Sequence, residues 1–309
     1  MASYKTPPTL NPTLQQEINS MVTVFAANST AIAEKITFKG LEASGVKATK
    51  VSLPPLIQLI DTVIVPTVHF WEGGWGDHPN DSGGATMRGV ILATLNSLFN
   101  SIFIDTNIPQ VKTAAEAWNR NHPNWRNDPQ LGKQLLYLLA GDEKVGSLFI
   151  YKFLASGSNR YPIAIMTEDP FLGFFFAECC WGTGAGVYGS SYADFDGLLK
   201  KFGWDGESSS WASFINSLGD KTPEIAMQAI LYRYKHIMRI SREGTKNNVF
   251  QTGWLRRLLN DNKSDLMMLV VINEKFNLNS GGAFQLSQAE LQHLNRKAEI
   301  YKKLSLELP

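Results

Sequence analysis

The stretch Ile-Leu-Ala-Thr-Leu-Asn-Ser-Leu-Phe-Asn-Ser-Ile-Phe-Ile, which forms Ile91–Ile104, has an apolar pattern typical of a helix. Leu131–Leu139 and Val145–Leu154 are two further stretches of the same kind. Pro, Asn and Gly residues separate these stretches, and strand signals between them are few. The sequence therefore predicts a mainly α fold.

The N-terminal region begins with Pro7, Pro8 and Pro12, which favour an extended arm. From Thr13 onward, apolar residues recur at spacings of three, four and seven, which predicts one helix that ends before Gly40. Together with the rest of the chain, these patterns predict an N-terminal arm and helix, a large helical domain, a second helical region and a C-terminal helix, in residues 1–52, 53–208, 222–279 and 280–309.

The C-terminal third carries local signals for helix boundaries. Thr222-Pro223-Glu224 predicts a helix start, with an N-cap residue followed by proline at the first helical position. Phe250–Leu259 has the pattern of another helix. A hinge at Ser280-Gly281-Gly282 precedes the capping box Ser287–Glu290, which predicts the start of the last helix.

The composition limits the class of protein. The 309 residues have a formal net charge of +1 and are 44% hydrophobic and 18% charged, so the chain is able to bury a large core. Near-neutral charge argues against duplex nucleic acid as the main partner. We expect no membrane span, because polar residues and a proline interrupt the most apolar stretch, Leu53–Trp71. The N-terminus lacks the apolar core of a secretory signal peptide.

Cysteine and histidine give no sign of a metal or cofactor. The two cysteines, Cys179 and Cys180, are adjacent, which is unfavourable for a disulfide and provides no zinc spacing. No two of the five histidines have the i, i+4 spacing of a helical zinc site. We therefore expect a protein that works without a metal or cofactor.

One segment has the composition of a functional loop. Residues 72–89 read Glu-Gly-Gly-Trp-Gly-Asp-His-Pro-Asn-Asp-Ser-Gly-Gly-Ala-Thr-Met-Arg-Gly. Six glycines and one proline are incompatible with a continuous helix and typical of a loop whose backbone approaches a ligand closely. We expect Pro66 to start a short helix before this loop and Gly73 to end it.

Glu72 stands at the end of that predicted helix, next to aromatic rings at positions 70, 71 and 75. A carboxylate packed against aromatic surface loses hydration, which raises its pKa. A carboxylic acid that stays protonated near neutral pH is what cleavage of a glycosidic bond requires. A second carboxylate then attacks the sugar or activates a water, and Asp77 and Asp81 are local candidates.

This segment resembles the signature of glycoside hydrolase family 108. The matching positions are Glu72-Gly73-Gly74-Trp75, Pro79, Asp81, Gly83-Gly84 and Thr86. The family comprises bacterial and phage-borne lysozyme-like muramidases that cut the glycan strands of peptidoglycan. The resemblance thus implies a lysozyme-like helical domain in which Glu72 is the catalytic acid.

Elements farther along the chain are also similar to the family, in the family's order, from about residue 60 to residue 262. They are Asp169–Leu172, Ala177-Glu178, Trp181–Gly184, Arg239, Phe250, Gly253–Leu255 and Arg257. The last of these resemble a peptidoglycan-binding region, which places that region in residues 222–279.

These observations predict a set of site residues around Glu72. Asp81 is either the second carboxylate or an Asx-type brace of the glycine loop. The hydroxyl of Thr86 either contacts the catalytic carboxyl or its water, or caps the next helix. The residues expected to contact substrate are Trp75, His78, Gly83, Gly84, Trp181 and Tyr188.

The favoured hypothesis is a bacteriophage peptidoglycan hydrolase, either a tail-associated lysozyme or an endolysin, found in the virion or in the host cytoplasm before release. Phage tail or injection-machine proteins would then be partners of the N-terminal arm or the C-terminal helix. The alternative is a non-catalytic structural virion protein or wall-binding protein with a muramidase fold, since His78, Ala85 and Trp181 depart from the family pattern.

Overall fold

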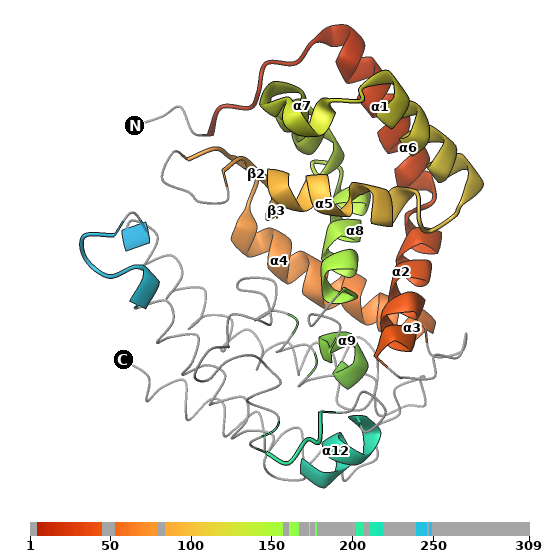
Figure 1. The fold of residues 1–309 in the computed structure, drawn as a ribbon, viewed down its shortest axis with the longest axis vertical. Helices are drawn as coiled ribbons and strands as arrows, with labels where there is room; N and C mark the ends of the chain where they lie inside the picture. Colours follow the sequence, from red (N-terminus) through yellow and green to blue (C-terminus); the bar gives the residue numbers. More distant parts are fainter. Residues whose placement is uncertain are drawn as a thin grey trace. The chain divides into compact units, whose positions relative to one another are not determined.

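The computed structural model in Figure 1 describes residues 5–44, 53–78, 84–156, 161–166, 173, 177, 200, 202–206, 211–218, 239–245 and 247–248. These residues are mainly helical, and a small antiparallel sheet accompanies the helices, which confirms the mainly α prediction. The chain forms two compact units, Met1–Lys39 with Val65–Phe153 and Gly40–Ile64 with Leu154–Pro309. This division differs from the domain boundaries expected from the sequence, which stay predictions.

The described elements follow one another along the chain. They are α1 (Pro12–Ala27), α2 (Ser29–Ala43), α3 (Leu53–Leu59), the π-helical turn η2 (Ile60–Ile64), α4 (Val65–Glu72), β1 (Trp75–Gly76), β2 (Thr86–Met87), β3 (Val90–Ile91), α5 (Leu92–Phe103), α6 (Pro109–Asn121), the 3-10 turn η3 (Trp125–Asn127), α7 (Pro129–Leu139), α8 (Glu143–Leu154), α9 (Tyr161–Met166) and α12 (Trp211–Leu218). No helix among the described residues is both long and apolar enough to cross a membrane.

The N-terminal helix predicted as one element is two helices. The side-chain amide of Asn28 donates a hydrogen bond to the Val24 carbonyl at 2.8 Å, and α1 ends before it. Helix α2 then continues through Gly40 to Ala43, so the predicted end before Gly40 is also wrong. A Cβ at Gly40 would lie 2.7 Å from the Ala155 Cβ, so glycine is present because the two backbones approach closely.

The three helices predicted from apolar stretches are confirmed as α5, α7 and α8. Helix α7 begins two residues earlier than expected, at Pro129. Its N-cap Asp128 accepts hydrogen bonds from the backbone N–H groups of Gln130 and Leu131 at 3.0 and 3.1 Å. The predicted helix starts at residues 222 and 287, the helix at 250–259 and the hinge at 280–282 lie outside the described residues.

An aromatic core unites the first unit. Phe25 of α1 stacks on Phe103 of α5 with ring centroids 4.0 Å apart. Phe99 packs edge-on against Phe103 and against Trp125, and Phe149 of α8 packs edge-on against Phe103. All five rings are almost completely buried. Because large buried rings dominate core energetics, α1 is an integral part of this unit.

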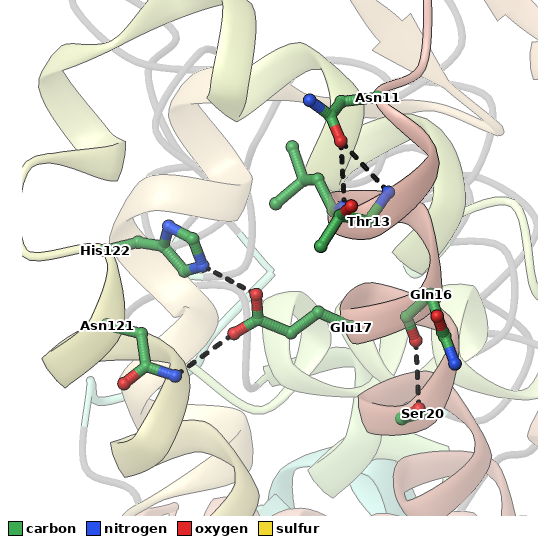
Figure 2. Close-up of polar contacts among 8 residues, drawn as sticks. Asn11, Thr13, Gln16, Glu17, Ser20, Asn121 and His122 are labelled. Atoms are coloured by element: carbon green, nitrogen blue, oxygen red, sulfur yellow. Dashed lines mark hydrogen bonds and ion pairs between the residues drawn. The ribbon is translucent and has the colours of Figure 1, made fainter.

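Polar contacts also join α1 to the helices beside it. Figure 2 shows the carboxylate of Glu17 bound by His122 Nε2 at 3.0 Å and by the amide of Asn121 at 3.3 Å, both at the C-terminal end of α6. Asn11 caps α1 through its side chain, and its backbone N–H donates to Gln134 of α7 at 3.1 Å. These contacts fix the N-terminal helix along α6 and α7.

The small sheet lies between α4 and α5 in the sequence and has the strand order β1-β2-β3. Trp75 pairs with Met87. Strands β2 and β3 are joined by Arg88 and Gly89, whose φ angles are 50° and 82°. Two successive positive φ angles are typical of a type I′ hairpin turn, which favours Asn, Asp or Gly at its first position. Arg88 occupies that position at a cost of about 1 kcal/mol.

Candidate active site

Helix α4 carries Glu72 as its last residue. Val65 and Val68 are buried and hold the helix in the core of the first unit. Gly73 has a φ of +67° and its N–H donates to the His69 carbonyl at 3.1 Å, which is the geometry of a left-handed C-terminal cap. The expected end of this helix at Gly73 is thus confirmed. The expected start at Pro66 is wrong, because α4 begins at Val65 and follows η2 directly. Glu72 lies partly exposed at the start of the glycine-rich loop.

Open space borders this loop. A Cβ placed on Gly73, Gly74, Gly76 or Gly84 would meet no heavy atom within 4 Å in the part of the chain that the structure describes. Gly73 and Gly84 also have positive φ angles, so their backbone conformation favours glycine. Gly74 and Gly76 have neither a positive φ nor a close neighbour among the described residues, so neither feature explains glycine at these two positions.

Trp75 lies in β1 directly after the glycine pair and is half-buried. Its ring contacts Tyr137 of α7 edge-on, with centroids 5.7 Å apart and an interplanar angle of 83°. The indole Nε1 is buried and has no hydrogen-bond partner among the described residues. The ring is therefore held in place by α7.

A second contact fixes the same segment on α7. Lys133 Nζ lies 2.7 Å from Asp77 Oδ2 and donates a charge-assisted hydrogen bond to it. Lys133 and Tyr137 are four residues apart and share one face of α7, where each contacts one residue of the segment. Neither residue was predicted from the sequence. Their i, i+4 spacing on a predicted helix was the one feature that placed them on the same face. Asp77, considered above as a second carboxylate, is thus engaged by a lysine.

Thr86 lies in β2 opposite Gly76, and its hydroxyl donates to the Gly84 carbonyl at 3.2 Å. The N-cap residue of α5 is Ile91, so the alternative that Thr86 caps the next helix is wrong. Because the strand partner of Thr86 is a glycine without a side chain, the threonine side chain faces the open space beside Gly76.

A group of charged residues surrounds the last turn of α4. Burial lowers the pKa of His69, and the positive charge of Arg88 lowers it further, while Glu143 has the opposite effect. His69 Nε2 is buried and has no hydrogen-bond partner among the described residues. Arg88 Nη1 lies 4.0 Å from Glu143 Oε2. His69 is therefore neutral at pH 7, one helical turn before Glu72.

The first unit brings together Glu72, Trp75, Gly84 and Thr86, and it also contains His78, which is partly exposed. The other expected site residues lie outside the described residues, and their roles stay predictions. They are Asp81, Gly83, Trp181 and Tyr188. In the described ranges, no three side chains of His, Cys, Asp or Glu are grouped in a way that suits a metal ion.

Comparison with known families agrees with this geometry. Residues 65–124, from the first residue of α4 to the loop after α6, match the family model for glycosyl hydrolase 108. No curated protein and no solved structure matches the chain. The segment with Glu72 thus defines a glycoside hydrolase of the lysozyme type. Residues 65–124 are similar to glycosyl hydrolase 108, the family that the signature beginning at Glu72 indicated. The peptidoglycan-binding region expected in residues 222–279 stays a prediction.

Proposed function

We propose that the protein is a muramidase that cleaves the glycan strands of peptidoglycan, with Glu72 as general acid. The observation that carries this proposal is the position of Glu72. It is the last residue of α4, within the segment that matches the family, and it borders the open space of the glycine loop. A long polysaccharide requires such an open approach, because sugars on both sides of the cleaved bond must be accommodated.

The proposed reaction uses two carboxylates. The protonated carboxyl of Glu72 donates its proton to the glycosidic oxygen as the bond between that oxygen and the sugar carbon breaks. Water supplies the new oxygen on that carbon, directly or after a covalent step on the second carboxylate. The proton that water loses goes to Glu72 in the second case and to the other carboxylate in the first. We assign the second carboxylate to Asp81, since Asp77 is engaged by Lys133.

Several other residues would orient the sugar. Trp75 presents an aromatic ring fixed by Tyr137, and aromatic rings stack well on sugar faces. The hydroxyl of Thr86 lies on the open side of the sheet. The remaining expected contacts are His78, Gly83, Gly84, Trp181 and Tyr188.

We further propose that this muramidase belongs to a bacteriophage, as a tail-associated lysozyme or an endolysin. In the first case the N-terminal arm or the C-terminal helix would bind tail or injection-machine proteins. Mass spectrometry of purified particles distinguishes the two, because only a tail-associated lysozyme is a component of the virion.

The experiment for Glu72 is a clearing assay on purified peptidoglycan with the wild type and Glu72→Gln. Glutamine keeps the size of the side chain but has no acidic proton to transfer to the leaving oxygen, so we expect activity to fall about 10³-fold. Glu116→Gln is the matched control. Glu116 is exposed on α6, 3.9 Å from Lys112, and we expect its substitution to leave activity unchanged.

Two outcomes would contradict the proposal. Equal clearing by the wild type and Glu72→Gln would remove Glu72 from its role. If the folded wild type binds peptidoglycan without releasing reducing sugar ends, the alternative of a non-catalytic wall-binding or structural protein is favoured.

A further inference from the structure

Arg88 breaks the residue preference of the turn in which it lies. Its φ of 50° and the φ of 82° at Gly89 place it at the first position of a two-residue hairpin turn. Asn, Asp and Gly tolerate that conformation best, and a long cation has no local advantage there. Local rules are most often broken at functional sites, so an observed outlier justifies asking what the side chain does.

The contact between Arg88 and Glu143 does not account for this arginine. The two charged groups are 4.0 Å apart, at the outer limit of an ion pair. The Glu143 side chain is 74% exposed and that of Arg88 is 29% exposed, so solvent screens the interaction. A guanidinium has five N–H donors, and the one long contact that it makes with the described residues leaves most of them available.

The turn also lies beside the candidate active site. Met87, the residue before Arg88, is the strand partner of Trp75. The charge of Arg88 acts electrostatically on His69, one helical turn before Glu72. Arg88 is thus a half-buried cation that follows the strand partner of Trp75 and acts on the last turn of α4. This position suits contact with a negatively charged group of the substrate.

We propose that Arg88 binds a carboxylate of the substrate, and that this contact selects glycan strands that carry peptide or lactyl carboxylates. The inference rests on the proposed muramidase function. A guanidinium pairs with a carboxylate through two parallel hydrogen bonds, which gives both energy and geometric selectivity. Glu143 occupies the guanidinium in the free protein and is displaced by the substrate carboxylate.

The test measures binding to insoluble peptidoglycan by co-sedimentation, in the Glu72→Gln background so that the polymer stays intact. Arg88→Asn removes the guanidinium and installs a residue that the turn prefers, so a loss of binding is not a failure to fold. We expect about tenfold weaker binding to native peptidoglycan. We expect no change on peptidoglycan whose carboxylates have been amidated, and thermal unfolding of the variant at or above the parent temperature.

Glu143→Gln is the matched variant on the other side of the pair. It frees the guanidinium, so we expect binding to tighten about twofold to threefold. If the arginine serves only the ion pair, the two variants change binding in the same direction. A third substrate, glycan stripped of its peptides by an amidase, carries only lactyl carboxylates. An effect of Arg88→Asn that persists there shows that the guanidinium binds the lactyl carboxylate of strands without peptide, and one that disappears assigns the contact to the peptide.

The proposal is overturned if Arg88→Asn weakens binding to native and amidated peptidoglycan equally, if it leaves binding unchanged, or if the Glu72→Gln parent does not bind. Failure of the proposed function is recognised separately, by equal clearing of peptidoglycan by the wild type and Glu72→Gln. Because binding is measured without catalysis, the contact of Arg88 is tested whatever the role of Glu72.

Discussion

Two arginines of the first unit, Arg126 and Arg88, occupy opposite kinds of environment. The guanidinium of Arg126 donates to the Asn96 carbonyl at 3.2 Å and to the side chains of Asn119 and Asn100 at 3.4 and 2.8 Å. It also lies over the Trp125 ring, 4.2 Å from its centroid. Arg88 has a 4.0 Å contact with an exposed glutamate. Within the described part of the chain, the donors of Arg126 are engaged and most of those of Arg88 are available.

The largest effect is expected from removing the engaged arginine. Arg126 joins η3 to α5 and α6, and Asn119 Oδ1, one of its acceptors, also accepts from the indole of the buried Trp125 at 2.9 Å. Arg126→Ala leaves these acceptors short of a partner, so we expect the free energy of unfolding to fall by about 2 kcal/mol. Urea denaturation followed by fluorescence measures it.

The matching variant of the second arginine is Arg88→Asn, whose stability is also measured by urea denaturation. Asparagine suits the left-handed turn position, so we expect no loss of stability and a gain of up to about 1 kcal/mol. A loss as large as that of Arg126→Ala would mean that Arg88 is a structural residue, and the difference between the two arginines would disappear.

How far the sequence predicts this structure depends on the range of the interactions involved. The apolar stretches of α5, α7 and α8 are local patterns, and they predicted the helices correctly. The break at Asn28 was missed because the apolar spacing runs through it from Phe25 to Ile32, although Asn28 is the C-cap residue of α1.

The candidate site shows the same limit. The position of Glu72 at a helix end was predictable because the signal, a following glycine, is adjacent in the sequence. Asp77 and Lys133 are 56 positions apart in the sequence, and no local pattern predicts a contact over that separation. The hairpin turn at Arg88 was missed because its first residue contradicts the preference on which turn prediction depends.

Two neighbouring glycines beside Glu72 provide a test of intermediate size. Gly73 has a positive φ and Gly74 does not, although both face open space in the described part of the chain. We expect Gly73→Ala to lower the free energy of unfolding by about 1 kcal/mol, because alanine is strained in the left-handed region. Gly74→Ala should stay within about 0.5 kcal/mol of the wild type.

The rate of peptidoglycan clearing also distinguishes Gly73→Ala from Gly74→Ala. If the open space beside Gly74 accommodates substrate, Gly74→Ala lowers the rate of peptidoglycan clearing while stability is kept. Equal unfolding free energies for the two variants would contradict the assignment of Gly73 as the residue that ends α4.

The smallest expected effect is on the pH dependence of stability and concerns His69. Its Nε2 has no partner among the described residues, whereas His122 binds Glu17. Burial and the charge of Arg88 lower the pKa of His69 in the folded protein below the value of about 6.5 in the unfolded chain. As the pH falls below about 6.5, the unfolded chain takes up a proton that folded His69 resists, so the free energy of unfolding decreases.

His69→Gln removes this contribution without adding a charge. We expect the difference in unfolding free energy between pH 7 and pH 5, measured by urea denaturation, to be smaller in the variant than in the wild type. Arg88→Asn should reduce the difference partly, because the arginine charge supplies part of the pKa change while burial remains. Parallel pH curves for the wild type and both variants would contradict the electrostatic contact between the hairpin turn and the last turn of α4. Arg88 would then lack a measured link to the helix that carries Glu72, and its role in substrate binding would rest on the turn geometry alone.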